Sequence, residues 1–73
     1  MAISFTEENY LKVIHRLSEA TSEDISTNAV AELMQTKAAS VTDMLRKLAD
    51  KGWVNYQKYQ GVRLSPTGEK IAL

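Results

Sequence analysis

The segment Ala38–Val54, with the sequence AASVTDMLRKLADKGWV, constrains the fold more than any other part of the chain. Its apolar residues recur at the i, i+3, i+4 and i+7 spacing that aligns one face of a helix; they are Val41, Met44, Leu45 and Leu48. The other face has hydroxyl side chains near its start and cations in its middle. A helix that reads DNA needs short polar side chains near base edges and cations near phosphates. We therefore predict a helix that packs on a core through one face and contacts DNA through the other.

The N-terminal residues predict a first helix over Thr6–Ala20, with Thr6 as its N-cap. Phe5 and Tyr10, on either side of this cap, have the spacing of a hydrophobic staple. The glutamates in the first turn suit the positive end of the helix dipole. The expected core face of this helix consists of Tyr10, Leu11, Ile14 and Leu17.

A second helix is predicted over Thr27–Met34, with Ser26 as its N-cap and Ile25 and Val30 as a second staple. Its inward-facing residues are expected to be Val30, Leu33 and Met34. A three-residue turn, Gln35-Thr36-Lys37, joins it to the amphipathic helix. Two short helices connected in this way form a helix-turn-helix.

After the amphipathic helix the pattern changes to that of a β-hairpin. Gly52 is the C′ glycine that ends the helix, and Trp53 is expected to close the core rather than to stack on a base. Two runs then alternate between apolar and polar residues; their apolar members are Val54 and Tyr56 in the first and Val62 and Leu64 in the second. Residues 58–61 form the turn, where Gly61 is available for a positive φ.

Ser65 and Pro66 have the N-cap and N1 pattern that opens a fourth helix. The sequence thus predicts an α+β fold that is mainly α. It is a winged helix-turn-helix with three helices, a two-stranded antiparallel wing and the start of a fourth helix. The last residues, GEKIAL, predict helical turns with no stop signal after them, so we expect the chain to be a fragment of a longer protein.

The 73 residues are expected to form one domain, 1–73, in which the charge is unevenly distributed. Residues 1–36 contain two cations and six acids, a net charge of −4, whereas residues 37–73 contain seven cations and three acids, a net charge of +4. A polyanion is therefore steered to the second half.

Composition also excludes several classes of function. The chain has no cysteine and one histidine, so disulfides and thiolate metal sites are excluded and enzyme chemistry has little basis. No apolar run approaches the roughly 20 residues that a membrane span needs, and the first residues lack the pattern of a signal peptide. We expect a cytoplasmic protein that is not an enzyme and has no membrane partner.

Four segments carry a family resemblance over nearly the whole chain; they are TEENYLKVIHRLSE, STNAVAELM, KAASVTDMLRKLADKGWV and YQGVRLSPTGEKIA. Together they resemble the N-terminal winged helix of the diphtheria-toxin-repressor family, the iron- or manganese-dependent repressors of bacteria. The resemblance implies a homodimer on an inverted-repeat operator in double-stranded DNA. It also implies that Fe²⁺ or Mn²⁺ binds chiefly in a metal-binding and dimerisation domain C-terminal to residue 73. The fragment itself is then expected to be monomeric and to hold no complete cofactor site.

The resemblance places several residues at or near the major groove, namely Lys37, Ala39, Ser40, Thr42 and Asp43. The family often has Ser-Pro where this chain has Lys37-Ala38. Because lysine cannot cap a helix N-terminus, Thr36 is the alternative N-cap. Asp43 either accepts a hydrogen bond from cytosine N4 or pairs with Arg46 or Lys47 on the helix surface, and the sequence favours neither.

Further DNA contacts are predicted on both sides of this helix. Thr27 and Asn28 open the helix that crosses the DNA backbone in a helix-turn-helix. Arg46 and Lys47 are the cations expected near phosphates. In the hairpin, Lys58 and Arg63 are expected to contact phosphates. Tyr59 either donates its hydroxyl to a phosphate or packs against the wing, and packing is favoured. Ser40 and Asp43 are instead expected to influence the choice of sequence.

One position on the first helix matters for metal binding. In the family, the side chain that matches Asn9 helps to bind the regulatory metal, and relatives usually carry Met or Asp there. Manganese-sensing members add an acid one turn on, where this chain has Lys12. An amide oxygen is a weak ligand and lysine is none, so Asn9 belongs at most to an incomplete site. His15 is expected to pack near the core face, with metal ligation as the lesser alternative.

The sequence therefore predicts sequence-specific binding of duplex DNA by the reader domain of a metal-dependent bacterial transcriptional repressor. The net charge of zero leaves open a winged helix that serves as a protein–protein interaction module. A DNA reader from another regulator family, such as the multidrug-resistance regulators, is the other alternative because it shares the fold.

Overall fold

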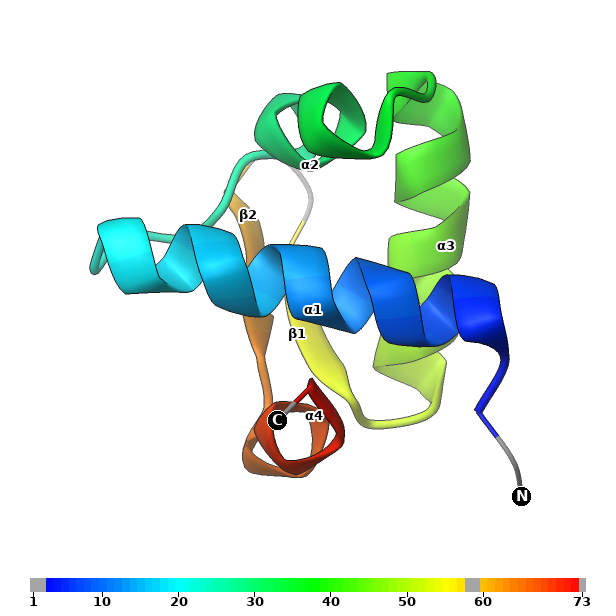
Figure 1. The fold of residues 1–73 in the computed structure, drawn as a ribbon, viewed down its shortest axis with the longest axis vertical. Coiled ribbons are helices and arrows are strands. Elements are labelled where there is room, and N and C mark those ends of the chain that lie inside the picture. The colour runs from blue at the N-terminus through cyan, green and yellow to red at the C-terminus, as the bar shows by residue number, and fades with distance from the viewer. Residues whose placement is uncertain (1–2, 58–59, 73) are drawn as a thin grey trace.

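The computed structural model describes residues 3–57 and 60–72, which form four helices and a two-stranded antiparallel sheet (Figure 1). In chain order the elements are α1 (Phe5–Ala20), α2 (Thr27–Met34), α3 (Ala38–Asp50), β1 (Val54–Gln57), β2 (Gly61–Leu64) and α4 (Pro66–Ala72). In Figure 1, α1 crosses the middle of the fold, with α2 above it, α4 below it and α3 beside its N-terminal end. The predicted winged helix-turn-helix is confirmed. Within the described residues, no helix has the length and apolar character needed to cross a membrane.

The N-terminus of α1 differs from the prediction. Ser4, not Thr6, is the N-cap: its hydroxyl accepts a hydrogen bond from the Glu7 N–H at 3.1 Å, and the Glu7 carboxylate accepts one from the Ser4 N–H at 3.1 Å. This reciprocal pair is a capping box. The helix therefore begins at Phe5, whose side chain is 79% exposed, so the predicted staple between Phe5 and Tyr10 is wrong.

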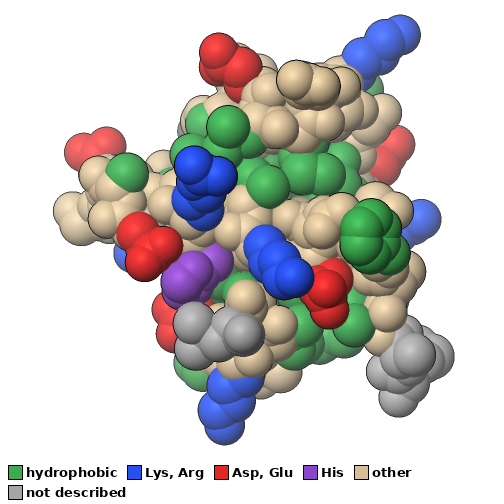
Figure 2. All heavy atoms as spheres, in the orientation of Figure 1, with side chains coloured by type: hydrophobic (Ala, Val, Ile, Leu, Met, Phe, Trp, Pro, Cys, Tyr) green, Lys and Arg blue, Asp and Glu red, His purple; other side chains and the backbone are tan. Residues whose placement is uncertain are grey.

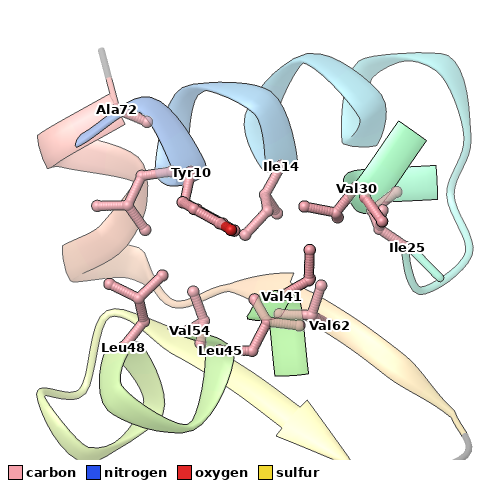
Figure 3. Packing of buried hydrophobic residues seen from close by; sticks show 12 residues of the cluster. Tyr10, Ile14, Ile25, Val30, Val41, Leu45, Leu48, Val54, Val62 and Ala72 are labelled. Atoms are coloured by element: carbon pink, nitrogen blue, oxygen red, sulfur yellow. The ribbon is translucent and has the colours of Figure 1, made fainter. Parts of the chain in front are cut away.

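The core lies where α1, α3 and the hairpin meet, with α2 closing one end (Figure 3). The fully buried side chains come from α1, α2, α3 and β2; they are Leu11, Ile14, Val30, Val41, Leu45, Leu48 and Val62. Met34, Met44 and Leu17 are partly buried against this core. Leu33, expected to face inward, is 48% exposed. The buried face of α2 is instead defined by Val30, Ala31 and Met34, and Ala31 is too small to give a clear signal in the sequence.

The hairpin has the alternation that the sequence predicts. Val54 pairs with Leu64 and Tyr56 with Val62, so these four apolar residues share the face that packs on the core. Gly61 has a φ of 120°, a conformation that favours glycine, at the start of β2. Gly52, with a φ of 80°, follows the last turn of α3 as predicted.

The junction between α3, the hairpin and α4 is held by several hydrogen bonds. The Trp53 N–H donates to the Leu48 carbonyl at 3.0 Å, and the Ser65 N–H donates to the Trp53 carbonyl at 3.1 Å. The Ser65 hydroxyl donates to the Gly52 carbonyl at 2.7 Å and accepts from the Gly68 N–H at 3.0 Å, which confirms Ser65 as the cap of α4. Trp53 is partly buried against the core, as expected, and its ring lies 4.9 Å from the Lys51 ammonium.

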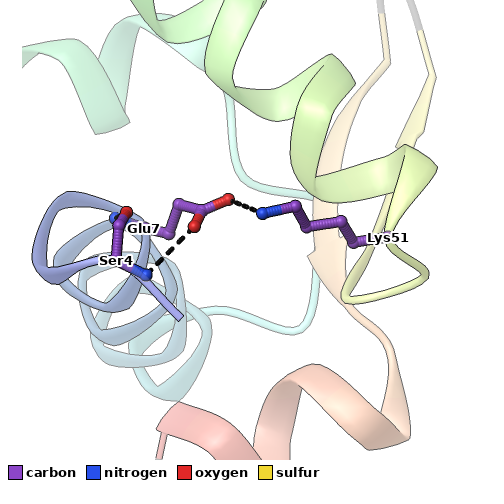
Figure 4. A network of polar contacts seen from close by, with 3 residues as sticks. All are labelled: Ser4, Glu7 and Lys51. Atoms are coloured by element: carbon purple, nitrogen blue, oxygen red, sulfur yellow. Dashed lines mark hydrogen bonds and ion pairs between the residues drawn. The ribbon is translucent and has the colours of Figure 1, made fainter. Parts of the chain in front are cut away.

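A partly buried ion pair joins the first turn of α1 to the end of α3 (Figure 4). The Lys51 ammonium donates to the Glu7 carboxylate that also belongs to the capping box. The Glu7 side chain is only 9% exposed. The hydrogen bond from Lys51, followed by the one from the Ser4 N–H, lowers the pKa of Glu7 against the opposing effect of burial.

This pair predicts a specific loss of stability in acid. A carboxyl group with a lowered folded-state pKa stabilises the fold above its unfolded pKa, near 4.5, and loses that contribution as the pH falls through the folded value. Thermal melts between pH 7 and pH 3 should therefore show a smaller decrease in Tm for Glu7→Gln than for the parent. Glu8→Gln is the matched control, because Glu8 makes an exposed i, i+4 pair with Lys12. Equal slopes for the parent and Glu7→Gln would contradict the assignment.

Candidate nucleic-acid interface

The outer face of α3 is fully available to a partner. Because Val41, Leu45 and Leu48 point into the core, the opposite side of the helix consists of Ala39, Asp43, Arg46, Lys47 and Asp50, all exposed. Ala39 and Ser40 near its start are small, which permits close approach of the helix backbone to a base edge. The arrangement predicted for a DNA-reading helix is thus present in the side chains of α3.

The turn between α2 and α3 depends on one residue that the sequence analysis missed. Gln35 adopts a left-handed conformation, with a φ of 54° and a ψ of 46°, and its N–H donates to the carbonyls of Ala31 and Glu32. The Thr36 N–H also donates to the Ala31 carbonyl, at 3.0 Å. Left-handed backbone at a helix C-terminus satisfies carbonyls that the helix leaves free. No glycine or asparagine marks this position, so the sequence contained no signal for it.

The start of α3 corrects a second expectation. Lys37, not Thr36, is the N-cap, and its extended backbone makes no side-chain capping hydrogen bond. The Lys37 carbonyl accepts from the Val41 N–H at 3.1 Å. The side chain of Lys37 is therefore not engaged in capping and is exposed at the end of the helix where a phosphate is favourable.

An open hollow lies between α2 and the start of α3. It collects polar side chains from both helices and the turn, and its lining consists of Asn28, Ala31, Glu32, Gln35, Thr36, Lys37 and Ser40. Three predicted DNA-contact residues, Asn28, Lys37 and Ser40, thus share one concave surface. Glu32 and Gln35 were not predicted as part of it.

A second hollow lies between the start of α2 and the hairpin turn. It is lined by Ser26, Thr27, Asn28, Gln60 and Gly61. Asn28 lines both hollows, so the surface continues from the hairpin turn across the start of α2 to the start of α3. Gln60 was not predicted, although its position next to the turn glycine is a signal that could have identified it.

Two predicted residues of α3 behave differently from each other. The Thr42 hydroxyl donates to the Ala38 carbonyl at 3.1 Å, and the side chain is only partly exposed at the edge of the outer face. Asp43 is exposed, and among the ion pairs of residues 3–57 and 60–72 none joins it to Arg46 or Lys47. The side-chain pairing that the sequence left open is not present, and Asp43 is available to a partner.

The hairpin residues divide into two groups. Lys58 and Tyr59 lie outside the described residues. Arg63 is bound to the loop between α1 and α2, where its Nη1 donates to the Ser22 carbonyl at 2.7 Å and to the Asp24 carboxylate at 3.3 Å. The phosphate contact predicted for Arg63 remains a prediction, but its guanidinium already has two protein acceptors.

The candidate metal residues do not form a cluster. Asn9 is partly buried on α1, and Lys12, one turn on, pairs with Glu8 at 3.2 Å. His15 pairs with Glu19 at 3.8 Å. No group of three or more His, Cys, Asp or Glu side chains in the described part of the chain is placed to hold a metal ion.

The face that carries α1 has mixed charge. Figure 2 shows cations and acids mixed along α1 and hydrophobic side chains gathered between α1 and α2. The outer face of α3 also carries both signs, with Arg46 and Lys47 near Asp43 and Asp50. The face formed by α3, the start of α2 and the hairpin turn is the better candidate for a nucleic-acid interface because two hollows there join predicted DNA contacts.

Comparison with known proteins identifies the family of this chain. Residues 3–62 match the family described as iron dependent repressor, N-terminal DNA binding domain. An uncharacterised HTH-type transcriptional regulator of Methanocaldococcus jannaschii is 36% identical over 61 residues, which are 84% of this chain and 49% of the relative. The HTH-type transcriptional regulator MntR of Oceanobacillus iheyensis is 34% identical over 64 residues, 88% of this chain and 43% of the relative. The chain spans about half the length of these curated relatives.

Solved structures agree with the sequence comparison. The manganese regulator SloR superposes with a TM-score of 0.73 at 38% identity, covering 90% of this chain and 30% of that one. A hypothetical protein from Sulfolobus solfataricus superposes with a TM-score of 0.85 at 26% identity, covering 96% of this chain and 53% of that one. With the match over residues 3–62, these similarities show that the chain belongs to the family of N-terminal DNA-binding domains of iron-dependent repressors.

Proposed function

We propose that this chain binds duplex DNA through the face formed by α3, the start of α2 and the hairpin turn. The observation that carries the proposal is the pair of hollows that meet at Asn28, because they join the predicted contacts of three elements into one surface. In this arrangement α3 enters the major groove, with Ala39, Ser40 and Asp43 toward the bases. Thr27 and Asn28 lie against the DNA backbone, as the first helix of a helix-turn-helix does.

The cations of this half of the chain supply most of the affinity. Lys37, Arg46 and Lys47 are exposed on or next to α3, and Lys58 follows β1 in the sequence. Contacts to phosphates provide affinity without regard to sequence, whereas contacts to base edges provide the choice of sequence. We assign Ser40 and Asp43 to the second role, with Thr42 at the margin of the interface.

For the whole protein we propose repression controlled by Fe²⁺ or Mn²⁺, in the cytoplasm, by a homodimer on an inverted repeat. The membership of the family supports metal control. Within residues 3–57 and 60–72 the side chains do not fit such an ion by themselves, because Asn9 offers one weak oxygen and Lys12 is paired with Glu8. The proposal therefore places the metal ligands and the dimer contacts in the part of the protein outside residues 1–73.

The interface is tested by a matched pair of lysine variants. Lys37→Ala should weaken binding to all duplexes alike and lower the slope of log K against log salt by about 0.9, because one phosphate contact is lost. Lys70→Ala removes the same charge from exposed α4, on the opposite side of the fold from α2 (Figure 1), and should leave that slope unchanged. The measurement is fluorescence anisotropy of a labelled duplex at several salt concentrations.

Two outcomes would contradict the proposal. Equal losses for Lys37→Ala and Lys70→Ala would mean that net charge, rather than this face, determines binding. No binding by the parent chain to any duplex at low salt would favour the alternative of a protein–protein interaction module.

A further inference from the structure

The loop between α1 and α2 is attached directly to the hairpin. Ile25, the last residue before the cap of α2, forms a two-way backbone bridge with Val62 of β2: each N–H donates to the other carbonyl at 2.9 Å. The next residue, Ser26, accepts the Ala29 N–H at 3.0 Å as the N-cap of α2. The same few residues therefore begin α2 and hold the second strand of the wing.

Arg63 strengthens this attachment on the exposed side. Arg63 is the residue that follows Val62 on β2. Its Nη1 donates to the Ser22 carbonyl at 2.7 Å and to the Asp24 carboxylate at 3.3 Å. The Arg63 and Asp24 side chains are 49% and 35% exposed, so the ion pair is at the surface. Both acceptors lie in the loop, on the N-terminal side of Ile25.

At Gly61, the first residue of β2, the hairpin lies so close to the loop that no side chain would fit. A Cβ at Gly61 would lie 2.6 Å from the Ile25 carbonyl oxygen and 3.2 Å from the Asp24 Cβ. Gly61 and Gln60 in turn face Ser26, Thr27 and Asn28 across the second hollow. The position of the hairpin turn relative to the start of α2 is thus set by the contacts of Gly61, Val62 and Arg63 with residues 22–25.

We propose that Arg63 is a positioning residue for the wing, which acts through Asp24 and Ser22 and does not contact a phosphate. This role rests on the proposed function, because the hairpin turn and the start of α2 contact DNA together only if their separation is fixed. The Asp24–Arg63 pair adds a second, exposed attachment beside the bridge of Ile25 and Val62.

The role of Asp24 predicts a change in DNA affinity opposite to the one that its charge alone would give. Removing an acid from a DNA-binding surface ordinarily strengthens binding, because repulsion of the phosphates decreases. If Asp24 instead holds Arg63 in place, Asp24→Ala should weaken binding, by roughly threefold to tenfold for the loss of one such contact. Glu23→Ala is the matched control: Glu23 is the adjacent exposed acid, and it makes no ion pair within the described residues. It should bind as tightly as the parent or slightly more tightly.

A double-mutant cycle and the salt dependence complete the test. Arg63→Ala should weaken binding about as much as Asp24→Ala, and the double variant should be no weaker than Arg63→Ala alone. The salt slope of Arg63→Ala should stay at the parent value. A slope lower by about 0.9 would show that Arg63 contacts a phosphate and would overturn the proposal.

Further results of these measurements would also contradict the positioning role of Arg63. Tighter DNA binding by Asp24→Ala would overturn the positioning role. The same holds if the loss of affinity in the double variant equals the product of the losses in the two single variants. Thermal melts of each variant show that the fold is intact, which is expected because an exposed ion pair contributes little to stability. If the parent chain binds no duplex while Asp24→Ala and the parent melt alike, the proposed function fails, and this role fails with it.

Discussion

Leu45→Ala is expected to leave the chain largely unfolded at room temperature. Leu45 is fully buried at the centre of the apolar face of α3, between Val41 and Leu48. Truncation of a buried leucine costs about 2–5 kcal/mol, since the transfer free energy is lost and a cavity remains. A core of this size contributes only about 3–5 kcal/mol to the free energy of unfolding. The variant therefore loses most or all of the stability of the parent.

Thermal and urea unfolding followed by circular dichroism measure this effect. Lys47→Ala is the control on the same helix, because Lys47 is exposed and its replacement should change the free energy of unfolding by less than about 0.5 kcal/mol. A cooperative melt of Leu45→Ala within a few degrees of the parent would mean that Leu45 does not face the core.

Gly68→Ala is expected to be nearly as damaging for a different reason. A Cβ at Gly68 would lie 1.9 Å from the Trp53 carbonyl oxygen and 3.4 Å from the Leu64 side chain. The first neighbour is backbone that also accepts the Ser65 N–H, so its displacement would disrupt that hydrogen bond beside the cap of α4. Although alanine favours a helix over glycine by about 1 kcal/mol, the overlap should cost about 3 kcal/mol or more.

Gly52→Ala is the control that separates the steric overlap at Gly68 from the conformational strain of replacing a glycine. Gly52 has a φ of 80° and no atom within 4 Å of a Cβ placed there, so only conformational strain of about 1–2 kcal/mol applies. Fluorescence of Trp53, the only tryptophan, reports the displacement of α4 directly. If Gly68→Ala melts at or above the temperature of Gly52→Ala, α4 does not pack against the Trp53 backbone as described.

The sequence was most informative where one pattern had one physical interpretation. Val41, Leu45 and Leu48 have the spacing of a single helix face, and Ser65-Pro66 has a clear capping pattern; both predictions are confirmed. At the N-terminus the structure differs from the prediction, because Ser4 and not Thr6 is the cap. Thr6 is followed by two acids, whereas Ser4 has Glu7 at the third position of a capping box, and the reciprocal hydrogen bonds of the box decided the outcome.

The remaining differences come from tertiary contacts that a local pattern cannot contain. Leu33 is exposed because α2 packs through Val30 and the small Ala31, which hydrophobicity alone ranks below leucine. Arg63 was assigned to DNA as one of the cations of the hairpin, yet its acceptors are about forty positions earlier in the sequence. The candidate interface on α3 was predictable because it is the side of the helix that the core does not use. The contribution of Gln60 depended on how the hairpin meets α2.

The hydrogen bonds around Trp53 have a mechanical consequence. They bind the first turn of α4 to the residues that end α3, through Leu48, Gly52 and Ser65. The start of α4 is therefore tied to the residues that end α3, and a displacement of the first turn of α4 would break these hydrogen bonds or move the C-terminal end of α3 with it.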